Sequence, residues 1–281
     1  RAEASLNYTS DLVNLLANGN GQSLGETILL EERIDLTTYN EIGVGYARSF
    51  LDDKLVIGVR AKYLNGQFYA GTGDNGSLGI YTDPSNYNIT LTSNDISIQT
   101  AGTDILLNSE DYESSALTNY VTWTDNTGFA ADIGATFKFN NFTFEASVTD
   151  IGSITWREQV INYVLPNETT TLAGVDLDNS EDPTTEIQDQ IDDFFETQET
   201  YEEFTTTLNM KTYVSASYTM NDAHRFGLTM YNNNIYGEFT PSYAVAYNWF
   251  LGKKTTIGAL TSFGGQIEEP RFGANIATNL G

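Results

Sequence analysis

A period-two alternation of apolar and polar residues is the feature that most restricts how this chain can fold. In residues 55–64, Ile57 and Val59 share one face with other apolar side chains, whereas Arg60 and Lys62 share the opposite face. Side chains alternate between the two faces only in a β-strand. The charged face cannot contact lipid, so this pattern predicts a strand with one apolar face and one wet face.

The same alternation recurs along the chain over segments of about 9 to 12 residues, which is the length of a tilted strand that crosses a membrane. About ten strands are predicted from these segments. Clear examples lie at 129–139, 142–149, 208–218, 225–230 and 243–249, and weaker ones at 2–9, 39–50, 255–264 and 271–279.

Short and long connections alternate between these strands. The short ones are residues 51–54, 140–141, 221–224 and 251–254, and the long ones lie near 10–37, 66–128 and 153–206. Outer-membrane barrels sort their connections in this way, with short periplasmic turns and longer extracellular loops. The predicted fold is therefore all-β, a transmembrane antiparallel up-and-down β-barrel.

Composition fits this class without proving it. The mean hydropathy of -0.30 suits a soluble protein and equally a barrel whose lumen and loops are polar. No apolar run approaches the roughly 18 residues of a membrane-spanning helix, which excludes an α-helical membrane protein. Cysteine is absent, so there is neither a disulfide framework nor a thiolate zinc site.

Charge gathers in the two longest connections. Residues 66–128 hold eight acidic residues without Lys or Arg, and residues 157–205 hold fourteen, together 22 of the 38 acids behind a net charge of -25. Such a surface repels nucleic acid, so that class of partner is excluded. We expect one barrel domain over 1–281, incomplete at both ends, with long acidic extracellular loops at 66–128 and 153–206.

Some structure is expected inside the loops. Short strands are predicted at 78–82, 87–92, 95–100 and 105–107. A helix is predicted at 11–18, capped by Ser10 and stopped by Gly19. A second helix near 184–197 carries an apolar stripe, which either packs on the protein's own loops or docks a partner. The stripe consists of Ile187, Ile191, Phe194 and Phe195.

Site chemistry is sparse. No catalytic residues are predicted, because the single histidine, His224, falls in a short turn on the periplasmic side. No cofactor is expected except a weak calcium candidate, since Asp176, Asp178 and Asp182 present oxygen donors at alternate positions. That segment lacks the glycine and the final glutamate of an EF-hand loop, and an ordinary solvated acidic loop is the alternative.

Charged residues of both signs are predicted to face the lumen. They form either an ion-pair network that rigidifies the barrel or a lining that selects solutes. These residues are Glu41, Arg60, Lys62, Asp132, Glu145, Lys211 and Arg225.

Two segments carry a family resemblance. Residues 53–66, preceded by 43–47, and residues 11–20 resemble recurring parts of Bacteroidota outer-membrane barrels of a family of unknown function, distantly similar to FadL-like and PorV-like barrels. The resemblance implies a place in the outer membrane, in contact with its lipid and lipopolysaccharide. It also implies partners among other outer-membrane proteins or lipoproteins, and peptidoglycan through a domain not present in this sequence.

Three functions remain open at this stage. The first is a non-enzymatic scaffold or accessory subunit of an outer-membrane complex for barrel assembly, type IX secretion or envelope anchoring. The second is a passive channel or hydrophobic-solute transporter. The third is a soluble extracellular all-β binding protein.

Overall fold

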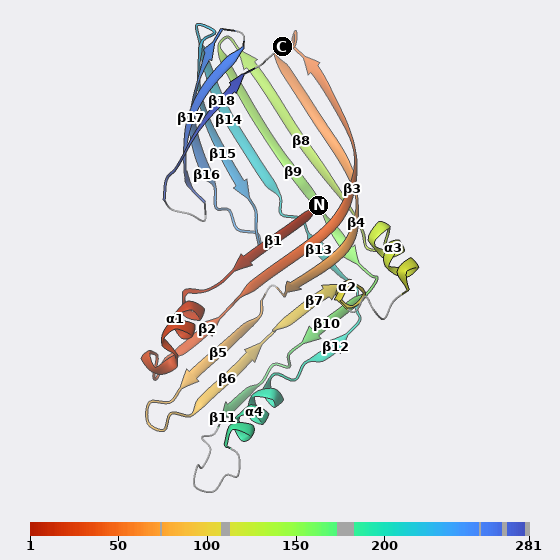
Figure 1. Cartoon of the computed structure of the whole chain (residues 1–281), viewed down its shortest axis with the longest axis vertical. Helices are drawn as coiled ribbons and strands as arrows, with labels where there is room; N and C mark the ends of the chain where they lie inside the picture. Colours follow the sequence, from red (N-terminus) through yellow and green to blue (C-terminus); the bar gives the residue numbers. More distant parts are fainter. Residues whose placement is uncertain (74, 108–112, 173–182, 253, 266–268, 279–281) are drawn as a thin grey trace. The chain divides into compact units, whose positions relative to one another are not determined.

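The computed structural model describes residues 1–73, 75–107, 113–172, 183–252, 254–265 and 269–278 (Figure 1). The chain divides into two compact units. Unit 1 comprises Arg1–Asn40, Asn65–Thr127 and Thr155–Thr205, and unit 2 comprises Glu41–Leu64, Gly128–Ile154 and Thr206–Gly281. Among the described residues, no helix is both long and apolar enough to span a membrane.

Unit 2 is built on nine antiparallel strands whose order in the sheet follows their order in the chain. This is the up-and-down arrangement that the alternating pattern predicts. The strands are β3 (Arg33–Phe50), β4 (Leu55–Thr72), β8 (Thr127–Phe139), β9 (Phe142–Trp156), β14 (Lys211–Met220), β15 (His224–Asn233), β16 (Ser242–Leu251), β17 (Thr255–Gly264) and β18 (Arg271–Thr278).

The short turns at 51–54, 140–141 and 221–224 form as predicted because their residues accept a left-handed backbone, and Gly252 does so in the described part of 251–254. Asp52, Asn140, Asp222 and Gly252 all have positive φ values, between 52° and 67°. Asn, Asp and Gly tolerate this region better than other residues do. Tight hairpins with such residues twist in the same sense as the strands they connect.

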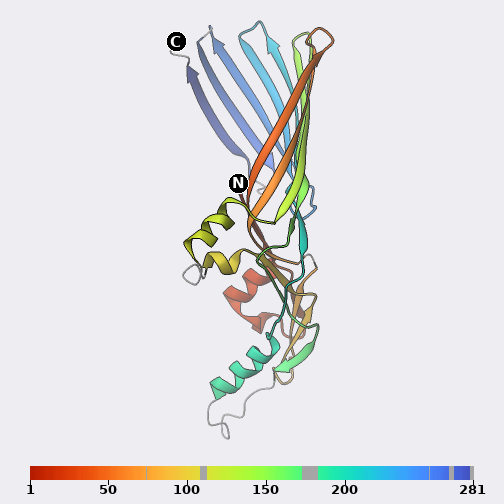
Figure 2. The same cartoon turned by 90° about the vertical axis from the view of Figure 1, so that its right-hand side faces the viewer.

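The sheet of unit 2 is curved but not closed. Figure 2 shows the curvature, and within the described residues the edge strands β3 and β18 do not pair with each other. The described part of the chain also holds 18 strands. The prediction of a closed barrel of about ten strands was therefore wrong in both respects, since alternation marks strands locally but does not report which edges meet.

The strand predicted at 2–9 forms as β1, which lies in unit 1, and the remaining strands lie within the long connections. In one sheet β1 (Ala2–Asn7) pairs with β3, and β7 (Ser97–Ala101) lies between β4 and β10 (Val160–Val164), with β12 (Gln198–Thr200) beyond. A second, four-stranded sheet has the order β11 (Thr169–Leu172), β6 (Ile89–Asn94), β5 (Ser77–Thr82), β2 (Thr27–Leu30). The short strand β13 (Phe204–Thr207) pairs with β9.

The helices of unit 1 are α1 (Ser10–Asn18), α2 (Thr103–Leu107), α3 (Ser114–Thr122) and α4 (Pro183–Phe194), with a 3₁₀ turn at Asn20–Gln22. Helix α1 ends at Gly19 as expected, but its cap is Thr9, whose hydroxyl accepts a hydrogen bond from the Leu12 backbone N–H at 3.2 Å. Residues 105–107 belong to α2, not to the predicted strand, because β7 ends before Gly102, which has a φ of 73°.

Two small apolar clusters form the core of unit 1. In the first, Phe194 of α4 is buried against Leu91 and Leu165. In the second, the rings of Tyr69 and Trp156 lie 5.5 Å apart and those of Tyr69 and Phe204 5.3 Å apart. The segments expected as long loops thus fold around cores of their own.

The two faces of the sheet of unit 2 differ as predicted. Its apolar side chains are not packed into a core, since Phe137 is 38% and Trp249 42% exposed. The opposite face bears small and polar residues and is hollowed. Within its described residues, unit 2 buries few apolar side chains, unlike the sandwich of a soluble protein.

Candidate functional site

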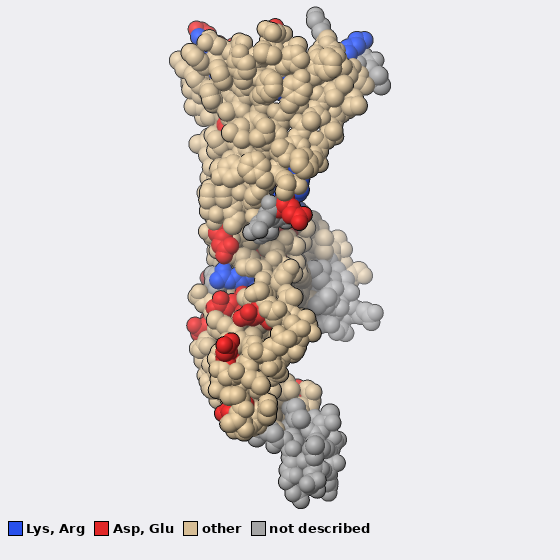
Figure 3. Space-filling model, turned by 90° about the vertical axis from the view of Figure 1, so that its left-hand side faces the viewer, with Lys and Arg blue, Asp and Glu red and all other residues tan. Residues whose placement is uncertain are grey.

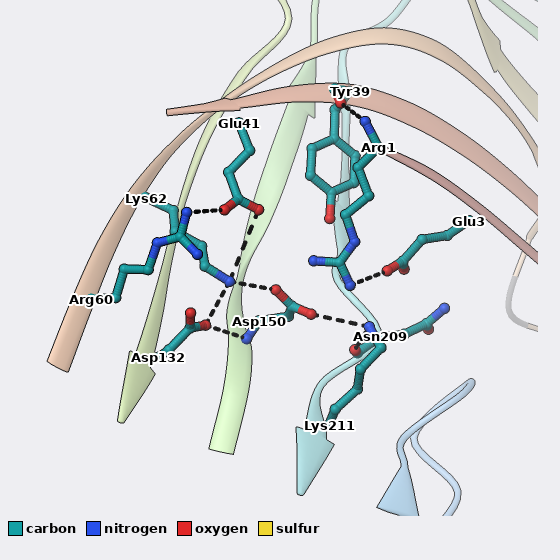
Figure 4. A network of polar contacts seen from close by, with 10 residues as sticks. All are labelled: Arg1, Glu3, Tyr39, Glu41, Arg60, Lys62, Asp132, Asp150, Asn209 and Lys211. Carbon is teal, nitrogen blue, oxygen red and sulfur yellow. Dashed lines mark hydrogen bonds and ion pairs between the residues drawn. The ribbon is translucent and has the colours of Figure 1, made fainter. Parts of the chain in front are cut away.

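The predicted lumen charges converge on Lys62, which lies on β4 in unit 2 (Figure 4). Its ammonium group is 2.6 Å from Asp132 Oδ1 and donates a 2.7 Å hydrogen bond to Asp150 Oδ1. The side chains of Lys62 and Asp150 are each only 3% exposed. A buried ammonium is stable only with partners of this kind, so these carboxylates hold the charge in place.

The network extends on either side of Lys62. Arg60 pairs with Glu41 at 2.9 Å, and Glu41 also lies 4.0 Å from Lys62. On the other side, Lys211 donates to the second oxygen of Asp150 at 3.0 Å. Three cations and three carboxylates from β3, β4, β8, β9 and β14 are thereby joined, and their charges balance.

A glycine makes room for the outer pair. A Cβ atom at Gly43 would lie 2.5 Å from Nε of Arg60. The guanidinium therefore rests directly over the backbone of β3, where it reaches Glu41. A side chain at position 43 would have to displace it.

Asp150 is the member of the network that the sequence pattern missed. On β9 the even-numbered residues Phe144 and Ala146 point to the apolar face, so strict alternation would place Asp150 there as well. Asp150 instead has a φ of 63°, and beyond it the even-numbered Trp156 is buried. A left-handed residue within a strand re-aims the side chains that follow it. The signal available in the sequence was a carboxylate at an apolar-face position.

Two predicted lumen residues lie outside this network. Glu145 accepts a 3.1 Å hydrogen bond from Ser215, and Arg225 donates to Ser217 at 3.1 and 2.8 Å. Each is held by a serine on the neighbouring strand. They line the polar face without joining the central cluster.

Small residues leave the polar face hollow beside the network. One cavity of about 550 Å³ is bordered by Gly58, Gly134, Glu145 and Ser147. A second, of about 380 Å³, shares the two glycines and Ser147 and extends to Arg60. These hollows have the size of small-molecule sites, but they are open and are lined mainly by small residues.

The stripe of the second predicted helix is used in part by the protein itself. Phe194 is 2% exposed in the cluster with Leu91, whereas Phe195 is 44% exposed and Ile191 is half-buried. The rings of Phe194 and Phe195 meet edge to face at 4.9 Å. The side chain of Ile187 lies outside the described part of the chain.

The part of the chain that the structure describes holds no group of side chains suited to a metal ion beside the network. The calcium candidates Asp176, Asp178 and Asp182 lie outside the described residues. Elsewhere in the described ranges, no three His, Asp or Glu side chains are grouped to hold a metal. His224 shares a 2.8 Å hydrogen bond with the hydroxyl of Tyr247, which occupies one of its ring nitrogens.

A second polar cluster lies in unit 1. Asn65 donates to the carbonyl of Thr124 at 2.7 Å, and Asn126 donates to the hydroxyl of Tyr120 at 3.4 Å. Burial, with a further contribution from the charge of Glu158, raises the pKa of Tyr120 well above its ordinary value. This cluster joins the middle of β4 to the segment around Thr124.

The comparisons with known proteins give one family and several distant folds. A model described as "Family of unknown function (DUF5723)" matches residues 1–281. No curated protein matches the chain. Among solved structures, a triple mutant of the Rhodopseudomonas blastica porin aligns at 14% identity over 99% of this chain and 91% of that chain, with a TM-score of 0.26.

Two further structures align in the same range. Another mutant of the same porin aligns at 14% identity, covering 100% of this chain and 91% of its own, with a TM-score of 0.25. A structure titled "Asymmetric conductivity of engineered proteins" aligns at 10% identity over 98% and 99% of the two chains, also with a TM-score of 0.25. TM-scores this low carry no conclusion about fold or function.

Proposed function

Because the chain belongs to the family of unknown function DUF5723, which supplies no activity, we propose from its own residues that it is a bacterial outer-membrane protein. In this proposal the nine-stranded sheet of unit 2 lies in the membrane with its apolar face on lipid. The polar face, with its ion-pair network, is turned away from lipid.

An aromatic row on the apolar face supports this placement. Phe142, Tyr218, Phe226 and Tyr247 lie opposite one another on β9, β14, β15 and β16. The rings of Phe142 and Tyr218 are 4.9 Å apart, and those of Phe226 and Tyr247 are 5.2 Å apart. The row lies close to the short turns. Membrane barrels carry an aromatic girdle at that level, where ring edges meet the lipid headgroups.

The height of the apolar band supports it as well. On β8, Phe129 and Phe139 bound a stretch in which Ala131, Ile133 and Phe137 point to the same face. Ten residues rise about 33 Å along a strand, or about 25 Å along the membrane normal at a tilt of about 40°. This equals the apolar band of an outer membrane.

Surface charge follows the same division. Figure 3 shows a broad area without Lys, Arg, Asp or Glu over the strands of unit 2, with charged residues beyond its ends. A soluble protein rarely leaves an uncharged apolar face of this extent in contact with water. The soluble binding-protein alternative would require that exposure.

Within the membrane we propose a non-enzymatic role, as a scaffold or accessory subunit of a larger outer-membrane complex. The observation that carries this is unit 1. It comprises the segment Arg1–Asn40 and two segments that lie between β4 and β8 and between β9 and β14 in the sequence, and it folds around cores such as the one at Phe194. A folded body offers a fixed surface to protein partners, which flexible loops do not.

The family resemblance extends this proposal to Bacteroidota and to complexes for barrel assembly, type IX secretion or envelope anchoring. Its partners would be other outer-membrane proteins or lipoproteins, besides lipid and lipopolysaccharide. The ion-pair network at Lys62 then holds five strands of the sheet together.

Fractionation and native electrophoresis test the two parts of this proposal. The protein should remain in outer membranes washed with urea, and in mild detergent it should migrate in a complex larger than the single chain. Release by the wash would contradict membrane insertion. Migration as a single chain in every mild detergent would contradict the subunit role and leave membrane insertion intact.

A passive channel is the second candidate, and the hollows on the polar face favour it. Glycines and serine border both cavities, which leaves space for water or a solute. Conductance in a planar lipid bilayer separates the two roles. A stable open pore that narrows in Gly134→Tyr would favour the channel, whereas a subunit without an open lumen should give no steady conductance.

A further inference from the structure

Within the strands that the structure describes, Arg48 is the one Lys, Arg, Asp or Glu side chain on the apolar face of the sheet of unit 2. It lies on β3 between Tyr46 and Phe50, which share that face. Its side chain is exposed, and it forms no ion pair with any described carboxylate. An arginine on the lipid-facing side of a membrane strand is costly at the middle of the membrane and nearly neutral at the interface. Arg48 therefore needs a partner at the interface.

The guanidinium of Arg48 points toward the short turn that follows β3. Its Cζ atom lies over the ring of Phe50, 5.4 Å from the ring centre, and Phe50 is two residues closer to that turn. Arg48 is separated from Leu51, where the turn begins, by about 10 Å along the strand, or about 8 Å along the membrane normal at a tilt of about 40°. A long arginine side chain bridges such a distance to reach the lipid headgroups.

Two lysines at the same end of the sheet add positive charge. Lys54 lies in the turn and Lys138 near the end of β8, and the backbone N–H of Lys138 donates to the carbonyl of Lys54 at 2.7 Å. Both side chains are exposed, and neither forms an ion pair with the described part of the chain. Asp52 and Asp53 in the same turn offset the lysines in part, which leaves the charge of Arg48 in excess.

An apolar hollow of about 370 Å³ lies on the same face of the sheet. Its lining includes three small residues, Ala135 of β8, Ala146 of β9 and Ala216 of β14, between larger ones such as Phe144 and Met230. Only β4 separates β8 from β3, so the hollow begins about 10 Å from β3, at about 4.8 Å per strand. On a lipid-facing surface no water is present to fill a hollow, so an acyl chain does.

We propose that Arg48 and this hollow hold one phospholipid, with its phosphate at Arg48 and one acyl chain in the hollow. A guanidinium forms two parallel hydrogen bonds with a phosphate, and stacking on Phe50 leaves its N–H edges available for them. Lys54 and Lys138 add to the attraction. Because short turns of such sheets face the periplasm, the lipid belongs to the periplasmic leaflet. The site rests on the proposed membrane role and names the lipid group that the sheet selects.

Native mass spectrometry of the full chain in detergent tests the site, with phosphatidylglycerol and a diacylglycerol of the same acyl chains as probes. One molecule of the phospholipid should bind saturably and at least about fivefold more tightly than the diacylglycerol. Fivefold is the equivalent of about 1 kcal/mol, the contribution of one cation near an anionic lipid. Equal binding of the two lipids, or absence of saturable binding of the phospholipid, overturns the proposal.

Two variants with matched controls separate the phosphate from the acyl chain. Arg48→Gln should abolish the preference for the phospholipid, whereas Arg225→Gln, on the polar face, should keep it. Ala135→Leu fills the hollow and should weaken both lipids by a similar factor, whereas Ala131→Leu on the same strand should weaken neither. An unchanged preference in Arg48→Gln, or unchanged affinities in Ala135→Leu, with the chain folded by circular dichroism, overturns the assignment.

Retention in urea-washed membranes tests the membrane role separately from the lipid site. A chain that stays in the washed membranes but binds the two lipids equally overturns the lipid site alone. A chain that the wash releases overturns the membrane role, and the lipid site with it.

Discussion

Replacing Lys62 with methionine removes the charge at the centre of the network while keeping the length of the side chain. Asp132 then loses its 2.6 Å partner, and Asp150 loses its 2.7 Å partner but keeps the contact with Lys211 at 3.0 Å. Breaking a buried ion pair by removing one partner costs about 3 to 5 kcal/mol, because a buried charge is left uncompensated. A loss of about 3 kcal/mol corresponds to more than a hundredfold change in the folding equilibrium.

Arg60→Met is the matched control. Arg60 belongs to the same network but its side chain is 47% exposed, and pairs exposed to this degree contribute about 0 to 1 kcal/mol. The difference between the two variants should therefore be about 2 to 5 kcal/mol. Equilibrium unfolding by urea in lipid vesicles, followed by tryptophan fluorescence, measures both free energies of unfolding.

A double-mutant cycle isolates the central pair. Lys62→Met, Asp150→Asn and the combined variant should give a coupling energy of about 1 to 3 kcal/mol, as expected for contacting residues of one network. The reasoning is refuted if Lys62→Met costs no more than Arg60→Met. A coupling energy close to zero would refute it as well.

Three other changes test separate parts of the structure. Phe194→Ala should destabilise unit 1 by about 3 to 5 kcal/mol, and the exposed Phe195→Ala far less, as measured by the rate of limited proteolysis within 70–205; equal rates would show that Phe194 does not anchor α4. Gly43→Ala should displace the Arg60 guanidinium. The double variant with Arg60→Met should then be no less stable than Arg60→Met alone. A further loss of stability in the double variant would show that the alanine disturbs the backbone of β3 instead. The pKa of Tyr120 is higher in the folded than in the unfolded chain, so the stability that this group contributes is complete below pH 10 and is lost as the pH rises toward the folded pKa. Tyr120→Phe should therefore reduce the dependence of the free energy of unfolding on alkaline pH. An unchanged dependence would contradict the burial of the Tyr120 hydroxyl.

The local elements of unit 2 could be predicted from the sequence. Its strands alternate two kinds of side chain, and its short turns contain Asn, Asp or Gly at positions with positive φ. Both signals depend only on neighbouring residues. The predicted strand 129–139 is nearly all of β8, and the predicted strand 142–149 is the start of β9. The predicted turn at 140–141 joins the two strands.

The strands of unit 1 could be predicted only in part, because their pairing joins distant segments. β6 pairs with β11, with Thr92 opposite Thr169 and Leu91 opposite Thr170. Threonine occurs on both faces of β11, so no alternation marks it as a strand. Its stability comes from the partner strand and from the cluster at Phe194, neither of which is visible in the local sequence.

The candidate site was predicted as a set of charges but not as a geometry. Glu41, Lys62 and Asp132, which alternation assigned to one face, meet at Lys62. It could not include Asp150, since a single left-handed residue reverses the faces of β9 at that point. The sequence also could not show that Glu145 and Arg225 bond to serines on neighbouring strands and do not join the network at Lys62.

The central claim is that one face of the sheet of unit 2 contacts lipid and the other does not. Because the chain has no cysteine, single cysteines at Leu228 and at Thr229 of β15 can each carry a nitroxide label in lipid vesicles. The account predicts high collision rates with lipid-soluble oxygen at 228 and markedly lower rates at 229. Equal rates at the two positions, or the reverse order, would contradict it.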